Sequence, residues 1–184
     1  MAEFIPVGSF DIVIFGGTGD LSRRKLLPAL YHRWADGQIP EDVKIIGVSR
    51  SEMDDAAFRE FAFEACEEAT PENLKKSEWK KFEKHLHYRA MDATDPDAEW
   101  GDLKGLLTLS DDRPVVFYLA VTPKIYVSIC EALGRNGLND GASRVVLEKP
   151  IGTDLASAHA INAGVGAVFK EECIYRIDHY LGKE

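Results

Sequence analysis

DIVIFGGTGDLS, residues 11–22, decides the fold of this chain. The run Asp11-Ile12-Val13-Ile14-Phe15 is typical of a buried β-strand, and the residues after Ser22 have helical spacing. Between them lies the turn Gly16-Gly17-Thr18-Gly19-Asp20-Leu21. A strand, a glycine-rich turn and a helix in this order are what a dinucleotide-binding fingerprint requires.

The glycines of this turn have a physical purpose in that interpretation. They let the backbone turn tightly and approach a pyrophosphate, whose charge the free N–H groups of the helix start stabilise. Ser22 stands at the third glycine position of GxGxxG and is small enough for close helix-to-strand packing. The spacing GxxxxGK[ST] of a nucleoside-triphosphate loop is absent. A turn that serves only to reverse the chain is the alternative.

The rest of the chain alternates between strand and helix patterns. The expected strands cover residues 10–15, 43–48, 87–91, 115–120, 144–147 and 174–177. Helical spacing of apolar residues covers 27–34, 58–65, 79–86, 103–107, 125–133 and 155–169. This alternation predicts an α/β fold, a doubly wound, Rossmann-like parallel sheet of about six strands in one domain over residues 1–184. Pro28 predicts a kink in the first helix, and residues 54–86 are long enough for two helices.

Composition narrows the class of protein. The 184 residues, 45% hydrophobic and 29% charged, fit one well-cored soluble domain without a membrane span. A net charge of −9 argues against a nucleic-acid surface, which needs a broad basic face. The start MAEFIPVGSF has no secretory pattern, so we expect a cytoplasmic protein. Three isolated cysteines fit buried thiols, and the histidines lack ligand spacing, so no metal site is expected.

The end of the second predicted strand favours NADP over NAD. An acidic residue at this place binds the ribose 2′-hydroxyl of NAD, whereas a cation accommodates the 2′-phosphate of NADP. The sequence Val48-Ser49-Arg50-Ser51 has no carboxylate there and offers the guanidinium of Arg50. Thr18 and the run Arg23-Arg24-Lys25 could add a hydroxyl donor and positive potential. The alternative for Arg50 is an ordinary solvated surface charge.

Three further motifs carry a family resemblance. They are GDLSRRKLLPALY at residues 19–31, EKPIGTDL at 148–155 and RIDHYLGKE at 176–184. Together they closely resemble glucose-6-phosphate 1-dehydrogenase from about Asp11 to the last residue. The last run is the most specific, whereas EKP alone also occurs in other sugar oxidoreductases.

The resemblance implies roles for individual residues. It assigns the pyrophosphate to residues 16–21, the 2′-phosphate to Arg50 and the adenosine side to Asp92 and Ala93. It places Tyr126 and Lys149 near the nicotinamide, with Lys149 also reaching a sugar hydroxyl. The residues implied at the substrate are His179, Tyr180 and Lys183 for the phosphate of glucose 6-phosphate, and Asp178, which orients a histidine base absent from this chain. Tyr126 as a packed aromatic and Asp92 as a turn cap are the alternatives.

The resemblance also implies what lies beyond this chain. Members of the family are more than twice as long and have a second α+β domain that supplies the base histidine and the subunit interface. We therefore expect an N-terminal part with little activity alone, and a homo-oligomer only for the full-length protein. Two other hypotheses are a glucose-fructose oxidoreductase type of enzyme, against which RIDHYLGKE speaks, and a non-catalytic NADP-binding sensor.

Overall fold

The computed structural model describes residues 7–110 and 112–177 of the chain. Within these residues, six parallel strands form one sheet in the order β3-β2-β1-β4-β5-β6. The strands are β1 (Asp11–Phe15), β2 (Lys44–Ser49), β3 (Leu86–Ala90), β4 (Val115–Leu119), β5 (Arg144–Glu148) and β6 (Ile174–Ile177). This order is that of a dinucleotide-binding doubly wound sheet, so the predicted fold class is confirmed.

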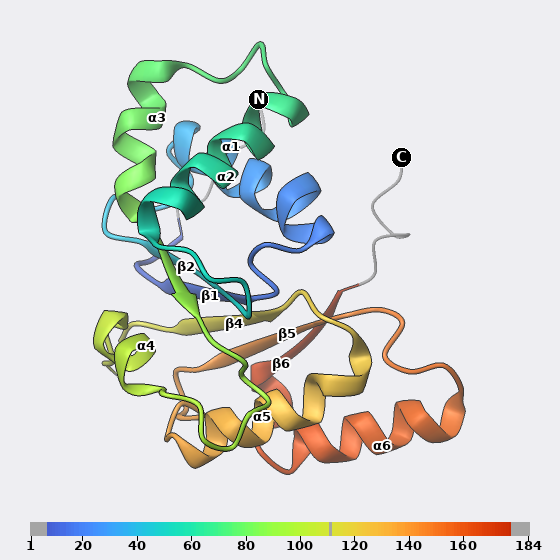
Figure 1. Cartoon of the computed structure of the whole chain (residues 1–184). Coiled ribbons are helices and arrows are strands. Elements are labelled where there is room, and N and C mark those ends of the chain that lie inside the picture. The colour runs from blue at the N-terminus through green and yellow to red at the C-terminus, as the bar shows by residue number, and fades with distance from the viewer. Residues whose placement is uncertain (1–6, 111, 178–184) are drawn as a thin grey trace.

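Helices cover both faces of the sheet, as Figure 1 shows. One face carries α1 (Leu27–Ala35), α2 (Asp55–Ala69) and α3 (Lys76–Phe82), and the other carries α4 (Gly101–Leu106), α5 (Tyr126–Arg135) and α6 (Leu155–Gly166). Short 3₁₀ turns are η2 (Glu83–His85), η3 (Pro123–Ile125) and η4 (Glu171–Cys173). In the part of the chain described here, no helix has the length and apolar character to cross a membrane.

The strand β1 shows how the sequence divides its apolar residues between two cores. Ile12 and Ile14 pack in the cluster under α1, α2 and α3, whereas Val13 and Phe15 pack in the cluster under α4, α5 and α6. Successive side chains of a strand point to opposite faces, so a sheet covered twice needs an apolar residue at every position. The continuous apolar runs of the central strands follow from this requirement.

Pro28 lies at the start of the regular helix and not in its interior, the position for which a kink was predicted. The π-helical segment η1 (Ser22–Leu26) leads directly into α1, and Pro28 lies in the first turn of α1. Proline has no N–H to donate, so the first turn of a regular α-helix tolerates it best. The helix α1 ends at Ala35 with Asp36 as its C-cap, and Gly37 has φ +70°, as expected for a glycine that follows a helix end.

Residues 54–86 form two helices, α2 and α3, as their length indicated. The second differs in detail from the prediction, because α3 ends at Phe82 and Leu86 is the first residue of β3. Leu86 is fully buried in register with Ile45 of β2. Its apolar side chain fitted the helical spacing, but sheet pairing determines its structure. The last helix is also shorter than predicted, since α6 ends at Gly166.

Candidate functional site

A cavity of about 730 Å³ lies beyond the carboxyl ends of β1, β2, β3 and β4. It is located where β1 lies between β2 and β4, the point at which the strand order reverses and ligands bind in doubly wound sheets. Its volume falls within the range of small-molecule sites, about 300 to 1,000 Å³. The lining residues are Phe15, Gly16, Thr18, Gly19, Val48, Ser49, Arg50, Ser51, Met91, Asp92, Ala93, Thr94, Val121, Thr122, Ile125 and Ile129.

Two glycines of the turn are required by close backbone contacts. Gly16 has φ +85°, and a Cβ atom on it would lie 2.3 Å from the carbonyl oxygen of Ala120. A Cβ atom on Gly17 would lie 2.7 Å from the Cα atom of Gly47 in β2. The amides of Gly16 and Gly17 both donate to the carbonyl of Val48, at 2.8 and 3.1 Å. The turn is therefore held against the ends of two strands, and no side chain fits at either position.

Ser22 fixes the start of the helix to this turn. Its side chain is fully buried, and its hydroxyl donates to the carbonyl oxygen of Gly16 at 2.8 Å. The amide of Gly19 donates to the same carbonyl at 2.9 Å. The small residue at the third fingerprint position thus permits the predicted close packing and adds a hydrogen bond that glycine could not make. The first N–H groups of the helix, which have no intrahelical acceptor, begin directly beside the cavity.

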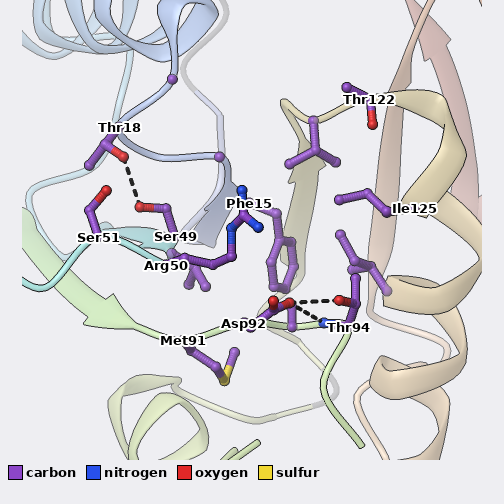
Figure 2. A pocket seen from close by; sticks show the side chains of 16 residues that line it. Phe15, Thr18, Ser49, Arg50, Ser51, Met91, Asp92, Thr94, Thr122 and Ile125 are labelled. Carbon is purple, nitrogen blue, oxygen red and sulfur yellow. Dashed lines mark hydrogen bonds between the residues drawn. The ribbon is translucent and has the colours of Figure 1, made fainter.

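Arg50 and Asp92 lie on the cavity wall at the ends of neighbouring strands (Figure 2). The side chain of Arg50 is exposed, and within the described residues no ion pair engages it. Asp92 accepts hydrogen bonds from the backbone amide of Thr94 at 3.0 Å and from its hydroxyl at 2.7 Å. These two bonds lower the pKa of Asp92, with a smaller contribution from the charge of Arg50. Asp92 therefore caps a turn at the rim of the cavity.

The basic run after the turn is not the free positive patch that the sequence indicated. The guanidinium of Arg23 pairs with Glu68 at 2.7 Å and with Glu64 at 3.4 Å, both on α2. Arg24 lies 3.7 Å from Asp20 on the same helix. Acidic partners therefore compensate two of the three cations. Lys25 is exposed and lies outside the residues that line the cavity.

Tyr126 is buried beneath the strand end that carries Lys149. Its hydroxyl donates to the carbonyl of Glu148 at 3.2 Å and accepts from the amide of Glu148 at 3.3 Å. Lys149 is exposed, its amide donates to the carbonyl of Ile177 at 3.2 Å, and its bond to Pro150 is cis. The alternative of a packed aromatic describes the surroundings of Tyr126. Asp178, His179, Tyr180 and Lys183 lie outside the described residues.

Sequence reasoning missed a chain of hydroxyl groups that joins two residues of the cavity lining to the buried Tyr88. The Oγ1 atom of Thr18 lies 2.8 Å from the Oγ atom of Ser49, which lies 2.7 Å from the hydroxyl of Tyr88. These residues come from the glycine turn, β2 and β3, and only the strand register brings them together. Thr94 and Thr122 at the cavity were also missed, although both follow strand ends closely.

Comparisons with known proteins agree with this geometry. The family model described as "Glucose-6-phosphate dehydrogenase, NAD binding domain" matches residues 13–184. The chain is 48% identical to the glucose-6-phosphate 1-dehydrogenase of Rhizobium meliloti over 184 residues and 50% identical to that of Gluconobacter oxydans over 186 residues. Both alignments cover 100% of this chain but only 37% and 38% of the relatives.

Solved structures give the same result. A glucose-6-phosphate dehydrogenase in complex with its substrate glucose 6-phosphate aligns with a TM-score of 0.85 and 31% identity, covering 100% of this chain and 39% of that one. The glucose-6-phosphate 1-dehydrogenase of Mycobacterium avium aligns with a TM-score of 0.82 and 34% identity, covering 95% of this chain and 37% of that one. The chain thus spans well under half the length of the relatives it matches. It belongs to the family of the glucose-6-phosphate dehydrogenase NAD-binding domain.

Proposed function

We propose that the chain binds NADP in the cavity, with the 2′-phosphate beside Arg50. The observation that carries this proposal is the end of β2, where an exposed arginine lines the cavity and no carboxylate occupies the tip. A guanidinium offers several N–H donors in a planar fork that matches phosphate oxygens. Asp92, the acidic residue among those that line the cavity, accepts both hydrogen bonds from Thr94 on one carboxylate oxygen, and within the described residues it forms no ion pair with Arg50.

The remaining parts of a dinucleotide fit the same wall. The pyrophosphate would lie over Gly16 to Leu21, where the close backbone and the first N–H groups of the helix favour an anion. Asp92 and Ala93, after β3, would contact the adenosine side, since this strand neighbours β2. Lys25 would add cationic charge at the outer edge of the helix. Tyr126 would act by holding the backbone of Glu148, and thereby Lys149, at the nicotinamide end.

For the longer protein that the relatives represent, we propose oxidation of glucose 6-phosphate to 6-phosphogluconolactone, the first step of the pentose phosphate pathway. Bound NADP supplies the acceptor for the hydride leaving C1. Lys149 would hold a sugar hydroxyl, and His179, Tyr180 and Lys183 would bind the substrate phosphate. Asp178 would orient a histidine that removes the C1 hydroxyl proton, as a carboxylate fixes the tautomer of other base histidines. We place this protein in the cytoplasm and expect the longer form to be a homo-oligomer.

The resemblance implies a base histidine outside these 184 residues, so the 184 residues alone should turn over little substrate. Catalysis needs base, substrate and cofactor held together, and misplacing one of them removes most of the rate. Full-length enzyme from a close relative, assayed for NADP reduction beside this chain, gives the comparison. Turnover of the chain within tenfold of the full-length enzyme would refute this expectation.

Binding of cofactor fragments tests the cofactor proposal independently of catalysis. Calorimetric titration of the chain with adenosine 2′,5′-bisphosphate and with 5′-AMP isolates the contribution of the 2′-phosphate. We expect the bisphosphate to bind about tenfold more tightly or better, because a charge-assisted hydrogen bond contributes about 1.5 to 3 kcal/mol. Equal affinities would remove the basis for assigning NADP.

A further inference from the structure

Tyr88 of β3 has a hydroxyl group that contacts both neighbours of Arg50. This hydroxyl donates to the backbone carbonyl of Ser51 at 2.7 Å and lies 3.3 Å from the carbonyl of Ser49. The Oγ atom of Ser49 lies 2.7 Å from the same hydroxyl. One buried oxygen atom therefore holds the backbone on either side of the arginine that lines the cavity.

The same contacts join Arg50 to the glycine turn. Ser49 continues the chain of hydroxyl groups to Thr18, at 2.8 Å between the two side-chain oxygens, as Figure 2 shows. Thr18 belongs to the turn proposed to hold the pyrophosphate. The spacing between the two phosphate-binding parts of the cavity is therefore fixed by side-chain hydrogen bonds as well as by the sheet.

The core prevents Tyr88 from moving. Its side chain is only 2% exposed, and its ring packs on Phe58 with 5.1 Å between ring centroids. On the outer edge of the sheet, its amide donates to the carboxylate of Asp55 at 2.8 Å. A hydroxyl on a ring fixed in this way holds its acceptors at defined positions. Arg50, by contrast, follows Ser49, the last residue of β2, so the strand pairing of the sheet does not hold its backbone.

We propose that Tyr88 is a positioning residue that sets the preference for NADP over NAD, acting through Arg50. The proposal rests on the proposed function, namely on the 2′-phosphate lying at Arg50. Because its hydroxyl orders Ser49 and Ser51, the guanidinium meets the phosphate without a cost for ordering the loop. NAD has no phosphate at this place, so its binding does not depend on the same order.

The test is the variant Tyr88→Phe, titrated with NADP and with NAD by calorimetry. Loss of the hydroxyl should raise the Kd for NADP about five- to tenfold, the equivalent of one hydrogen bond, and change the Kd for NAD less than about twofold. Tyr31→Phe is the matched control, since Tyr31 is also buried and its hydroxyl accepts the amide of Lys75 at 3.3 Å, away from the cavity. The Kd values for NADP and for NAD should both stay unchanged in this control.

The background Arg50→Ala separates the two proposals. There, Tyr88→Phe should change NADP binding less than about twofold, because the group it positions is missing. If Arg50→Ala leaves the preference for NADP intact, the proposed function itself fails. A second outcome is that Arg50→Ala removes the preference for NADP, but Tyr88→Phe weakens the binding of NADP and NAD equally or leaves both unchanged. Tyr88 then has no positioning role.

Circular dichroism and the Tm establish that Tyr88→Phe is folded. If it is not, Ser49→Ala replaces it, since this change removes the hydroxyl that joins Tyr88 to Thr18. Because the contacts of the Tyr88 hydroxyl with the carbonyls of Ser49 and Ser51 remain, the expected loss of NADP affinity is smaller than for Tyr88→Phe but still exceeds the loss of NAD affinity. An unchanged ratio of the two Kd values in a folded Ser49→Ala chain would overturn the inference.

Discussion

The start of β1 contains a buried ion pair whose loss can be predicted in magnitude. The side chain of Asp11 is 0% exposed, and its carboxylate accepts from Arg113 at 2.7 and 3.2 Å and from the amide of Thr108 at 2.7 Å. Arg113 also bonds to the carboxylate of Asp42 at the surface. Arg113→Met would leave the Asp11 carboxylate buried with its amide partner but without a counter-charge.

Breaking a buried pair from one side costs about 3 to 5 kcal/mol, which is a large share of the roughly 5 to 15 kcal/mol that stabilises a typical domain. For a chain of this size, that loss lowers the Tm by about 10 °C. Urea unfolding followed by circular dichroism measures the free energy of unfolding at pH 7. Arg33→Met serves as the control, because Arg33 is exposed and bonds only to Gln38 among the described residues, and it should change stability by less than about 0.5 kcal/mol.

A second substitution identifies the cause. Replacing both partners, as in Asp11→Asn with Arg113→Met, removes the uncompensated charge and should recover at least about 1 kcal/mol relative to Arg113→Met alone. A loss below about 1 kcal/mol for Arg113→Met, or no recovery in the double variant, would show that an uncompensated buried charge is not responsible.

Two further predictions concern titratable groups. Burial raises the pKa of Cys66 and of Cys130 to about 12, and Cys173 is buried too. Ellman's reagent at pH 8 should therefore detect less than one reactive thiol per native chain and three per chain unfolded in guanidinium. Three reactive thiols in the native chain would contradict this prediction. Burial lowers the pKa of His87 below its ordinary 6.5, against a smaller opposite effect of its hydrogen bond to the Asp55 carboxylate. The unfolded chain therefore takes up this proton first as the pH falls below about 6.5, and stability drops there, whereas above pH 7 the site contributes nothing. His87→Gln should lose less stability than the original chain between pH 7.5 and 5.5, and equal losses would count against the effect.

The sequence predicted the topology because the apolar runs and the glycine turn are local signals. The strands Val115–Leu119 and Ile174–Ile177 were placed within one residue of their observed ends, since each is a continuous apolar or β-rich run. Leu86 shows the limit of this reasoning. An apolar residue at the boundary between a helix and a strand fits both periods, and only its pairing with Ile45 decides between them.

Residues that line the cavity were found from the sequence where each follows one strand, and side-chain contacts that join different strands were missed. Gly16 and Arg50 could be found from position alone, because the carboxyl ends of parallel strands meet at one edge of the sheet. The pairing of Arg23 with Glu68 joins residues 45 positions apart, and it compensates a positive charge that the sequence predicted to be free. The contact of Tyr88 with Ser49 depends on strand register, which no local pattern contains.

The preference for NADP over NAD before and after Arg50→Ala tests the proposed cofactor site most directly. Calorimetric titration of both chains with both cofactors gives four Kd values, and circular dichroism shows that the variant is folded. If Arg50 binds the 2′-phosphate, Arg50→Ala raises the Kd for NADP about tenfold or more and the Kd for NAD less than about twofold. An unchanged ratio of the two Kd values in a folded Arg50→Ala chain would contradict the assignment of the 2′-phosphate, and with it the proposed cofactor.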